Sequence, residues 1–220
     1  MQGLAPKTLA VFDKVSALES IKDFVLVGGT GIALQINHRL SEDLDFCKWV
    51  SKTNVSNAIS VREIETELKK NFKIVTTNHL SFDQVDFRID GVKLTFFNEV
   101  GMICPQFKPI TFTENILGVP LLLHGSMKIK TLFERITYRD YYDLFTLLSE
   151  KHMSLDELLN ASVRYQPRLS KPMIIKRLSA WNLIKEDAGF SHLSPRYSVS
   201  PEEMGGFFLE EIKLLNCVEE

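Results

Sequence analysis

The sequence predicts an α+β fold, in which residues 1–118 form a small, mixed, twisted sheet with flanking helices and residues 119–220 form a helical C-terminal region. Residues 24–48 read in order as a strand, a glycine turn, a helix and a second strand. Alternating side chains over residues 82–98 flank Asp90-Gly91, a strong signal for a two-residue hairpin turn. From residue 121 onward the apolar residues recur mainly at helical spacing.

Two N-terminal helices follow from the spacing of apolar residues. The first covers residues 7–20, and we expect it to pack through Leu9, Phe12, Val15 and Leu18. The second covers residues 59–71, where dense charge surrounds a narrow apolar stripe made of Val61, Ile64 and Leu68. We therefore expect this second helix to be largely solvated.

The C-terminal region begins with a helix over residues 121–136, in which Lys128 lies beside the apolar stripe and can point along a cleft. Thr137 and Asp140 have the spacing of a capping box, in which Asp140 reaches back to the Thr137 amide. This interpretation gives Asp140 a structural role and leaves Asp143, one turn later and opposite the apolar stripe, available for chemistry. Three more helices are predicted around residues 155–159, 173–181 and 204–215.

The glycine turn is the first candidate site. Gly28 and Gly29 follow a short apolar strand and precede a helix, an order that directs backbone N–H groups at an anion. Thr30 either adds a hydroxyl to this site or caps the helix. The pattern indicates binding of phosphate groups.

A pair of carboxylates is the second candidate site. In Asp43-Leu44-Asp45-Phe46 polar and apolar residues alternate, so in a strand both aspartates lie on one face while Leu44 and Phe46 face the core. Two carboxylates in this arrangement suit Mg²⁺, which commonly binds one or two carboxylates together with substrate phosphates.

Several other sites are excluded by the sequence. Leu34 stands where a dinucleotide-binding fingerprint needs its third glycine or alanine, and no Gly-Lys-Ser/Thr completes a P-loop. The five histidines are scattered and include no H-E-x-x-H motif, which argues against a catalytic zinc.

The composition is that of an ordinary soluble protein. The formal net charge of −2 gives no global basic signature, so a nucleic-acid partner requires a local basic patch. Three cysteines without C-x-x-C spacing fit a reducing compartment. With no signal-peptide pattern and no membrane-spanning run, we expect a cytoplasmic protein without a membrane partner.

The combination of turn and carboxylates resembles a known family. The segment Gly28-Gly29-Thr30-x-x-Ala33-Leu34-x-x-x-His38-Arg39-x-Ser41-x-Asp43-Leu44-Asp45-Phe46 is similar to the first motif of the AbiEii/AbiGii-type nucleotidyltransferase toxins of type IV toxin–antitoxin and abortive-infection systems. A second block resembles the family's "MK…R…KDxxDL" segment: Met127-Lys128-Ile129, Arg135 and Arg139-Asp140-Tyr141-Tyr142-Asp143-Leu144. Weaker similarity continues at residues 185–188 and 207–211.

The resemblance implies a polymerase-β-like nucleotidyltransferase core in residues 1–118, and a helical region 119–220 that completes the active-site cleft. It implies an NTP substrate, Mg²⁺ or Mn²⁺, transfer of NMP to the 3′ end of a tRNA or to a protein hydroxyl, and a cognate antitoxin as partner. The catalytic residues it implies are Asp43, Asp45, Lys128 and Asp143. The nucleotide-binding residues it implies are Gly28, Gly29, Thr30, Arg39 and Lys128, although Arg39 can instead pair with Asp43.

One position departs from the family pattern. Enzymes of this fold usually carry a third carboxylate on the strand after the Asp-x-Asp strand, where this chain has Thr95. The hairpin register predicted from Asp90-Gly91 places Asp86 directly opposite Thr95, so that Asp86 becomes either a replacement metal ligand or a plain exposed aspartate.

Two other functions remain open at this stage. The missing carboxylate at Thr95 is consistent with a module that binds a nucleotide or a partner without turnover. Nucleotidyl or phosphoryl transfer to a small molecule is the other possibility, as in antibiotic-modifying enzymes on this scaffold.

Overall fold

The computed structural model describes residues 1–50, 59–185, 187 and 189–218. The chain divides into two compact units, Met1–Pro120 and Leu121–Glu220.

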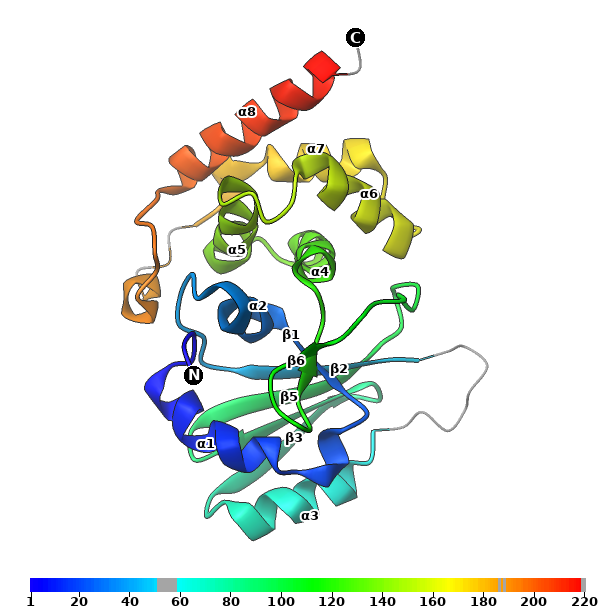
Figure 1. The fold of residues 1–220 in the computed structure, drawn as a ribbon, viewed down its shortest axis with the longest axis vertical. Helices are drawn as coiled ribbons and strands as arrows, with labels where there is room; N and C mark the ends of the chain where they lie inside the picture. Colours follow the sequence, from blue (N-terminus) through cyan, green and yellow to red (C-terminus); the bar gives the residue numbers. More distant parts are fainter. Residues whose placement is uncertain (51–58, 186, 188, 219–220) are drawn as a thin grey trace. The chain divides into compact units, whose positions relative to one another are not determined.

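The N-terminal unit is a sheet with helices on both faces (Figure 1). Its strands occur along the sheet in the order β3-β4-β5-β2-β1-β7-β6. The strand bounds are β1 Val25–Val27, β2 Leu44–Trp49, β3 Val75–Ser81, β4 Gln84–Ile89, β5 Val92–Glu99, β6 Ile110–Thr111 and β7 Leu117–Gly118. The pairs β2·β5 and β1·β7 are parallel and the other pairs are antiparallel, so the sheet is mixed as predicted.

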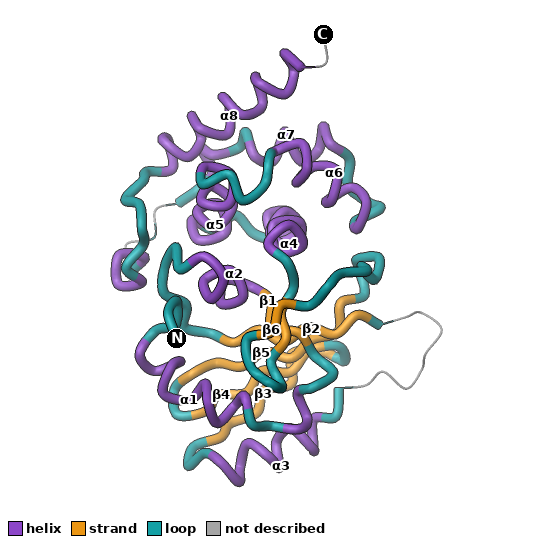
Figure 2. The backbone as a smooth tube through the Cα atoms, in the orientation of Figure 1, coloured by secondary structure: helices purple, strands orange, loops and turns teal. Residues whose placement is uncertain are grey.

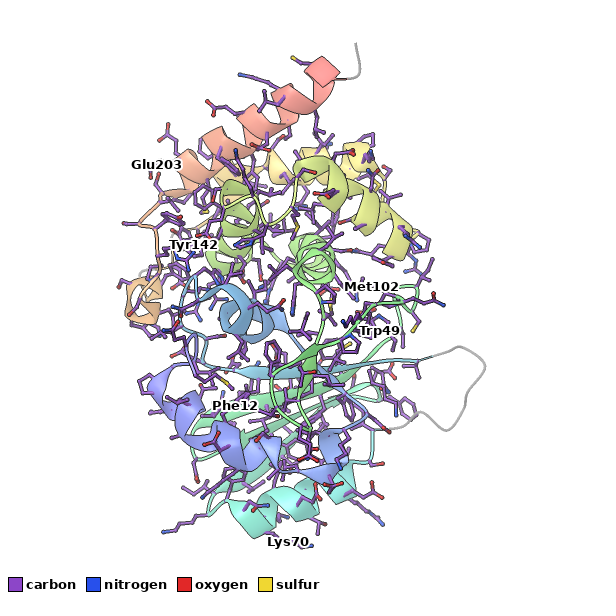
Figure 3. The ribbon with its side chains drawn as sticks, viewed as in Figure 1. Phe12, Trp49, Lys70, Met102, Tyr142 and Glu203 are labelled. Atoms are coloured by element: carbon purple, nitrogen blue, oxygen red, sulfur yellow. The ribbon has the colours of Figure 1, made fainter. Side chains whose placement is uncertain are left out.

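One face of this sheet buries the main apolar core. Helices α1 (Pro6–Ser16) and α3 (Val61–Asn71) lie on that face, and α2 (Gly28–Ile36) lies on the other (Figure 1). Phe12 on α1 is fully buried there, whereas Lys70 is exposed on α3 (Figure 3). Within the sheet, the rings of Phe46 and Phe96 stack with their centroids 5.0 Å apart. Burial of large apolar side chains on this face fixes which residues point to the opposite, polar face.

The predicted hairpin is confirmed. Asp90 (φ 47°) and Gly91 (φ 90°) both have positive φ, as a two-residue turn between right-twisted strands requires. The register pairs Ile89 with Val92 and Asp86 with Thr95.

Several N-terminal details differ from expectation. α2 begins at Gly28 itself, so the glycine turn is the first turn of the helix. Leu9 is 42% exposed, because α1 buries the side chains of Thr8, Val11, Phe12 and Val15 instead. Strand β3 was not predicted. It ends the sheet, and it contains neither a charged residue nor a proline.

The C-terminal unit is helical in the residues that the structure describes (Figure 2). Its α-helices are α4 Leu121–Glu134, α5 Tyr138–Ser149, α6 Leu155–Tyr165, α7 Lys171–Leu178 and α8 Pro201–Val218, with short 3₁₀ turns η2 Trp181–Leu183 and η3 Phe190–Leu193. At Gly205 of α8 an added Cβ would lie 2.1 Å from the Trp181 ring, so only glycine permits this close packing. Among the described residues, no helix combines the length and apolar character that crossing a membrane requires.

Candidate active site

The start of α2 holds one of the two predicted carboxylates. Gly28 has φ +70°, and a Cβ built on it would lie 2.5 Å from Asp45 Oδ2. Val27 pairs with Asp45 across β1 and β2, which explains this proximity. A side chain at position 28 would therefore both strain the backbone and displace the Asp45 carboxylate.

The second glycine of the turn lies against a cation. A Cβ on Gly29 would lie 2.2 Å from Arg39 Nη2, and Arg39 is only 5% exposed. The guanidinium also donates from Nη1 to the Leu40 carbonyl oxygen over 3.0 Å. Its charge adds to the partial positive charge of the α2 N-terminus, which makes this turn an electropositive end of the helix.

Thr30 joins the helix to the loop that carries Asp43. Its hydroxyl is buried, lies 2.7 Å from Ser41 Oγ and also bonds the Asp43 carbonyl oxygen. No side-chain hydrogen bond caps α2. Of the two roles considered for Thr30, capping is thus not observed, and the hydroxyl positions the Ser41–Asp43 loop.

Asp43 immediately precedes β2 and is half exposed. Lys93 Nζ lies 3.9 Å from Asp43 Oδ2, and the exposed fractions of the two side chains are 32% and 50%. Leu44 and Phe46 are buried in the core, which confirms the predicted alternation.

A polar row crosses the face of the sheet opposite the main core. The registers place Asp45 beside Thr95, Thr95 beside Asp86, and Asp86 beside Asn78. Asp86 Oδ1 and Thr95 Oγ1 are buried atoms without a hydrogen-bond partner among the described residues. Such orphaned atoms call for a ligand, a water or an ion.

The described residues contain no group of three or more His, Cys, Asp or Glu side chains that could hold a metal ion together. Asp86 is therefore in the predicted row but is not gathered with Asp43 and Asp45 into one such group. The donor set still suits Mg²⁺, because two carboxylates beside a phosphate-binding turn leave the remaining positions to substrate oxygens and water.

The second predicted motif forms a buried ionic cluster within the C-terminal unit. Lys128 Nζ on α4 lies 2.7 Å from Asp140 Oδ1 and 2.7 Å from Asp143 Oδ2, both on α5. Asp140 also accepts from Arg135 Nε at 2.9 Å and from the Thr137 hydroxyl at 2.5 Å. Lys128 thus connects α4 to α5 through two carboxylates.

This cluster corrects two predictions. The capping box is not formed, because Asp140 binds the Lys128 and Arg135 side chains and the Thr137 hydroxyl, and Thr137 makes no side-chain cap bond. Asp143 is not left available, because α5 is buried on nearly all sides and the Asp143 side chain is 0% exposed in its ion pair with Lys128.

The pKa values of Asp140 in the cluster and of His124 beside it are both lowered by their surroundings. Burial alone would raise the pKa of Asp140, but the charge of Lys128 and the hydrogen bond and charge of Arg135 outweigh it and hold that pKa at about 2. Burial and, to a smaller extent, the Lys128 charge lower the pKa of His124 to about 3, against the opposing effect of the Asp143 carboxylate.

Sequence reasoning did not single out His124. Its signal was present, because it lies four residues before Lys128 and therefore on the same face of α4.

The predicted residues thus fall into two groups. Gly28, Gly29, Thr30, Arg39, Asp43 and Asp45 gather around the start of α2, and Lys128 and Asp143 meet in the C-terminal unit.

Comparison with known proteins shows which family part of the chain resembles. Residues 10–108 match the family model described as the nucleotidyl transferase AbiEii toxin of type IV toxin–antitoxin systems. This segment is similar to AbiEii-type nucleotidyltransferases. The AbiEii-type match contains the whole group around α2, and the polar row from Asp45 to Asn78 as well.

Other similar proteins extend the comparison to the whole chain. An uncharacterized protein of Aquifex aeolicus is 26% identical over 218 residues, which cover 97% of this chain and 98% of that protein. The nucleotidyltransferase toxin MenT4 of Mycobacterium tuberculosis has a TM-score of 0.57 at 14% identity, covering 93% of this chain and 82% of that one. JHP933 of Helicobacter pylori has a TM-score of 0.53 at 17% identity, covering 99% and 100%. The two structures show the shared fold.

Proposed function

We propose that this AbiEii-type chain transfers NMP from an NTP to an acceptor hydroxyl, of an RNA such as a tRNA 3′ end or of a protein, and that it acts as the toxin of a toxin–antitoxin pair. The acceptor oxygen forms a bond to the α-phosphorus as the bond to the β-phosphate oxygen breaks. Pyrophosphate leaves, and the acceptor proton passes to water.

A single observation carries this proposal. The Asp45 carboxylate lies against Gly28 at the N-terminal end of α2, and Asp43 lies two residues earlier, immediately before β2. An anion-binding helix start beside paired carboxylates suits a nucleotide triphosphate with its cation. The backbone amides of Gly28 and Gly29, with the Arg39 charge behind them, are the proposed phosphate ligands.

Mg²⁺ or Mn²⁺ held by Asp43 and Asp45 would neutralise phosphate charge and polarise the α-phosphate. The chain's own contribution is positioning. Thr30 fixes the loop that carries Asp43, and Gly28 leaves the space that Asp45 occupies. Such positioning accounts for much of the rate in transfers of this kind.

Lys128 and Asp143 are proposed to serve the same reaction from the C-terminal unit. Lys128 bears a charge stabilised by two carboxylates, and Asp143 holds its ammonium group in place. We propose that Lys128 binds the β- or γ-phosphate and that Asp143 orients it, because Asp143 Oδ2 lies 2.7 Å from the Lys128 ammonium group.

The test is incubation with each labelled NTP, Mg²⁺ or Mn²⁺, and total tRNA, comparing Asp43→Asn and Asp45→Asn with Asp23→Asn, a largely exposed aspartate elsewhere on the unit. Both site variants should lose transfer by several orders of magnitude, and Asp23→Asn should remain near wild type. Label on RNA or on protein identifies the acceptor. Tight NTP binding without transfer under any condition would replace this proposal with the binding-module function.

A further inference from the structure

Positive charge without acidic residues is concentrated in one stretch of the C-terminal unit. Between Leu158 and Lys185 the sequence has no aspartate or glutamate, although the whole chain has 28 of them against 26 lysines and arginines. The stretch contains six cations: Arg164, Arg168, Lys171, Lys176, Arg177 and Lys185. We call the surface formed by these six residues the α6–α7 basic surface.

The most exposed of these cations point to solvent for structural reasons. α6 buries Leu155, Leu158 and Leu159, which leaves Arg164 on the outer side of its last turn. α7 buries Ile174 and Leu178, which leaves Lys176 exposed. Arg168 lies exposed in the connection between the two helices, which are in contact.

Other members of the surface have internal contacts. Lys171 Nζ lies 2.9 Å from Asp156 Oδ1, and the Arg177 guanidinium lies 5.0 Å from the centre of the Phe133 ring. These contacts already restrict the side chains of Lys171 and Arg177. The two side chains therefore lose less conformational entropy than freely moving ones when a ligand binds.

The N-terminal end of α7 belongs to this surface and carries no negative charge. The first turn of α7 has no acidic residue, and Ser170 makes no side-chain cap hydrogen bond. An anion approaching Arg168 and Lys171 therefore also meets the positive end of a helix dipole.

An ordinary solvated helix surface mixes charges of both signs. On the α6–α7 basic surface six cations face one contacting carboxylate, Asp156, and such an excess of positive charge on a chain of net charge −2 raises the local concentration of a polyanion. From this geometry we infer that the α6–α7 basic surface binds the phosphate backbone of an RNA acceptor. This inference rests on the proposed nucleotidyl transfer and names its acceptor class.

The experiment measures binding of fluorescently labelled bulk tRNA to the full chain at several KCl concentrations. It compares Arg168→Gln/Lys176→Gln with the control Lys151→Gln/Lys213→Gln, which removes two exposed cations from the same unit but outside the surface. If each removed cation contacts one phosphate, the slope of log affinity against log salt should fall by about 1.4–1.8. The affinity at 0.1 M KCl should fall roughly 25- to 60-fold.

The control should bind tRNA within about twofold of wild type, and all variants should keep wild-type NTP affinity and circular dichroism. Equal losses in both double variants, no loss in either, or transfer of label to protein without tRNA binding would each overturn the inference. The Asp45→Asn variant separates this inference from the proposed function, because tRNA binding can be measured in it without transfer. If Asp45→Asn binds tRNA and loses that binding when Arg168→Gln/Lys176→Gln is added, the basic surface is supported independently of transfer activity.

Discussion

Asp86 is the residue on which the composition of the metal site depends. It faces Thr95 across β4 and β5, Thr95 lies beside Asp45, and the facing Asp86 and Thr95 oxygens are buried without a partner among the described residues. We predict that Asp86→Asn weakens metal-dependent transfer at least tenfold, since a carboxylate in this row acts on the cation directly or through water. Steady-state rates over a range of Mg²⁺ concentrations test this.

The control is Asp83→Asn, which lies in the turn before β4 and should stay near wild type. Moving the carboxylate across the ladder, with Asp86→Thr and Thr95→Asp together, should recover part of the activity that Asp86→Thr loses, because opposed Cβ atoms are about 4.5–5.5 Å apart. Full activity of Asp86→Asn would leave Asp43 and Asp45 as the carboxylates of the site.

Lys128 has a structural role that is separable from substrate binding. Lys128→Met leaves Asp140 and Asp143 buried without their shared cation, so the free energy of unfolding should fall by about 3–5 kcal/mol. Urea denaturation measures this loss. Lys130→Met, which removes a largely exposed i,i+4 pair with Glu134, should cost less than about 0.5 kcal/mol.

Adding Asp143→Asn to Lys128→Met should return part of the lost stability, because one uncompensated charge is removed. If Lys128→Met unfolds at the wild-type urea concentration, the cluster does not stabilise the unit.

Some features of single residues were predictable from the sequence and others were not. The spacing of Leu44 and Phe46 sufficed to predict their burial on either side of Asp45, because strand alternation is local. The partners of Lys128 were not predictable, because they depend on how α4 packs against α5. The same packing buries Asp143, which the sequence pattern had left available for chemistry.

Among the elements, α2 ties its own first turn to the carboxylate of a neighbouring strand. We predict that Gly28→Ala lowers stability by about 1–3 kcal/mol and transfer at least tenfold. The alanine would have to adopt the positive φ of Gly28, which strains its backbone, and its Cβ would displace Asp45. Gly206→Ala on α8 is the matched control. Its Cβ meets nothing within 4 Å, so it should stabilise the chain by roughly 0.5–1 kcal/mol.

Thermal denaturation and transfer assays of both variants make the comparison. A Gly28→Ala enzyme with wild-type rate would mean that Asp45 tolerates another position.

The α4–α5 pair should make the chain sensitive to acid. The pKa of His124 falls from 6.5 to about 3 on folding, so below pH 6.5 the unfolded chain takes up a proton that the folded one refuses. The contribution of His124 to the free energy of unfolding is therefore fully present above pH 6.5. Between pH 6.5 and pH 4 this contribution should fall by about 3 kcal/mol. Asp140, with a folded pKa of about 2 against 3.8, adds a loss of about 2 kcal/mol as the pH falls from 3.8 toward 2.

Urea midpoints between pH 7 and pH 4 test this dependence. His124→Gln cannot take up the proton, so its midpoint should vary much less over that range. An unchanged pH dependence in His124→Gln would assign the acid sensitivity to other groups.

The elements that sequence patterns predicted are those with local signals. The β4–β5 hairpin carries Asp90-Gly91, and the burial of Ile64 and Leu68 in α3 follows helical spacing. The short strands β6 and β7 and the exposed strand β3 lack such signals, because their pairing is decided by distant partners.

At the scale of the whole molecule, the match of residues 10–108 to the AbiEii toxin family leads to a prediction about cells. Expression of the chain should arrest growth, and co-expression of an antitoxin encoded beside it should restore growth. Asp45→Asn should grow normally at equal protein level, because the arrest depends on transfer. Growth curves with immunoblots measure both. Arrest by Asp45→Asn as strong as by wild type would separate toxicity from catalysis.

The α+β class was predictable for the whole molecule because sheet-forming and helical patterns occupy successive parts of the chain. The polar row beyond Asp45 was predictable only as far as the hairpin register reached. Its continuation to Asn78 required the pairing of β3, which nothing in the sequence indicates.

The position of β3 also bears on how the protein behaves when concentrated. A terminal strand without charge or proline presents unpaired backbone groups that can template another strand, and the irregular register between His79 and Ser81 leaves residues 75–79 regularly paired on one side and open on the other. In concentrated stock solutions we therefore expect chains to associate by pairing at β3 before they precipitate through exposed apolar side chains. A lysine introduced at exposed Thr76 is the simplest way to keep such a stock monodisperse.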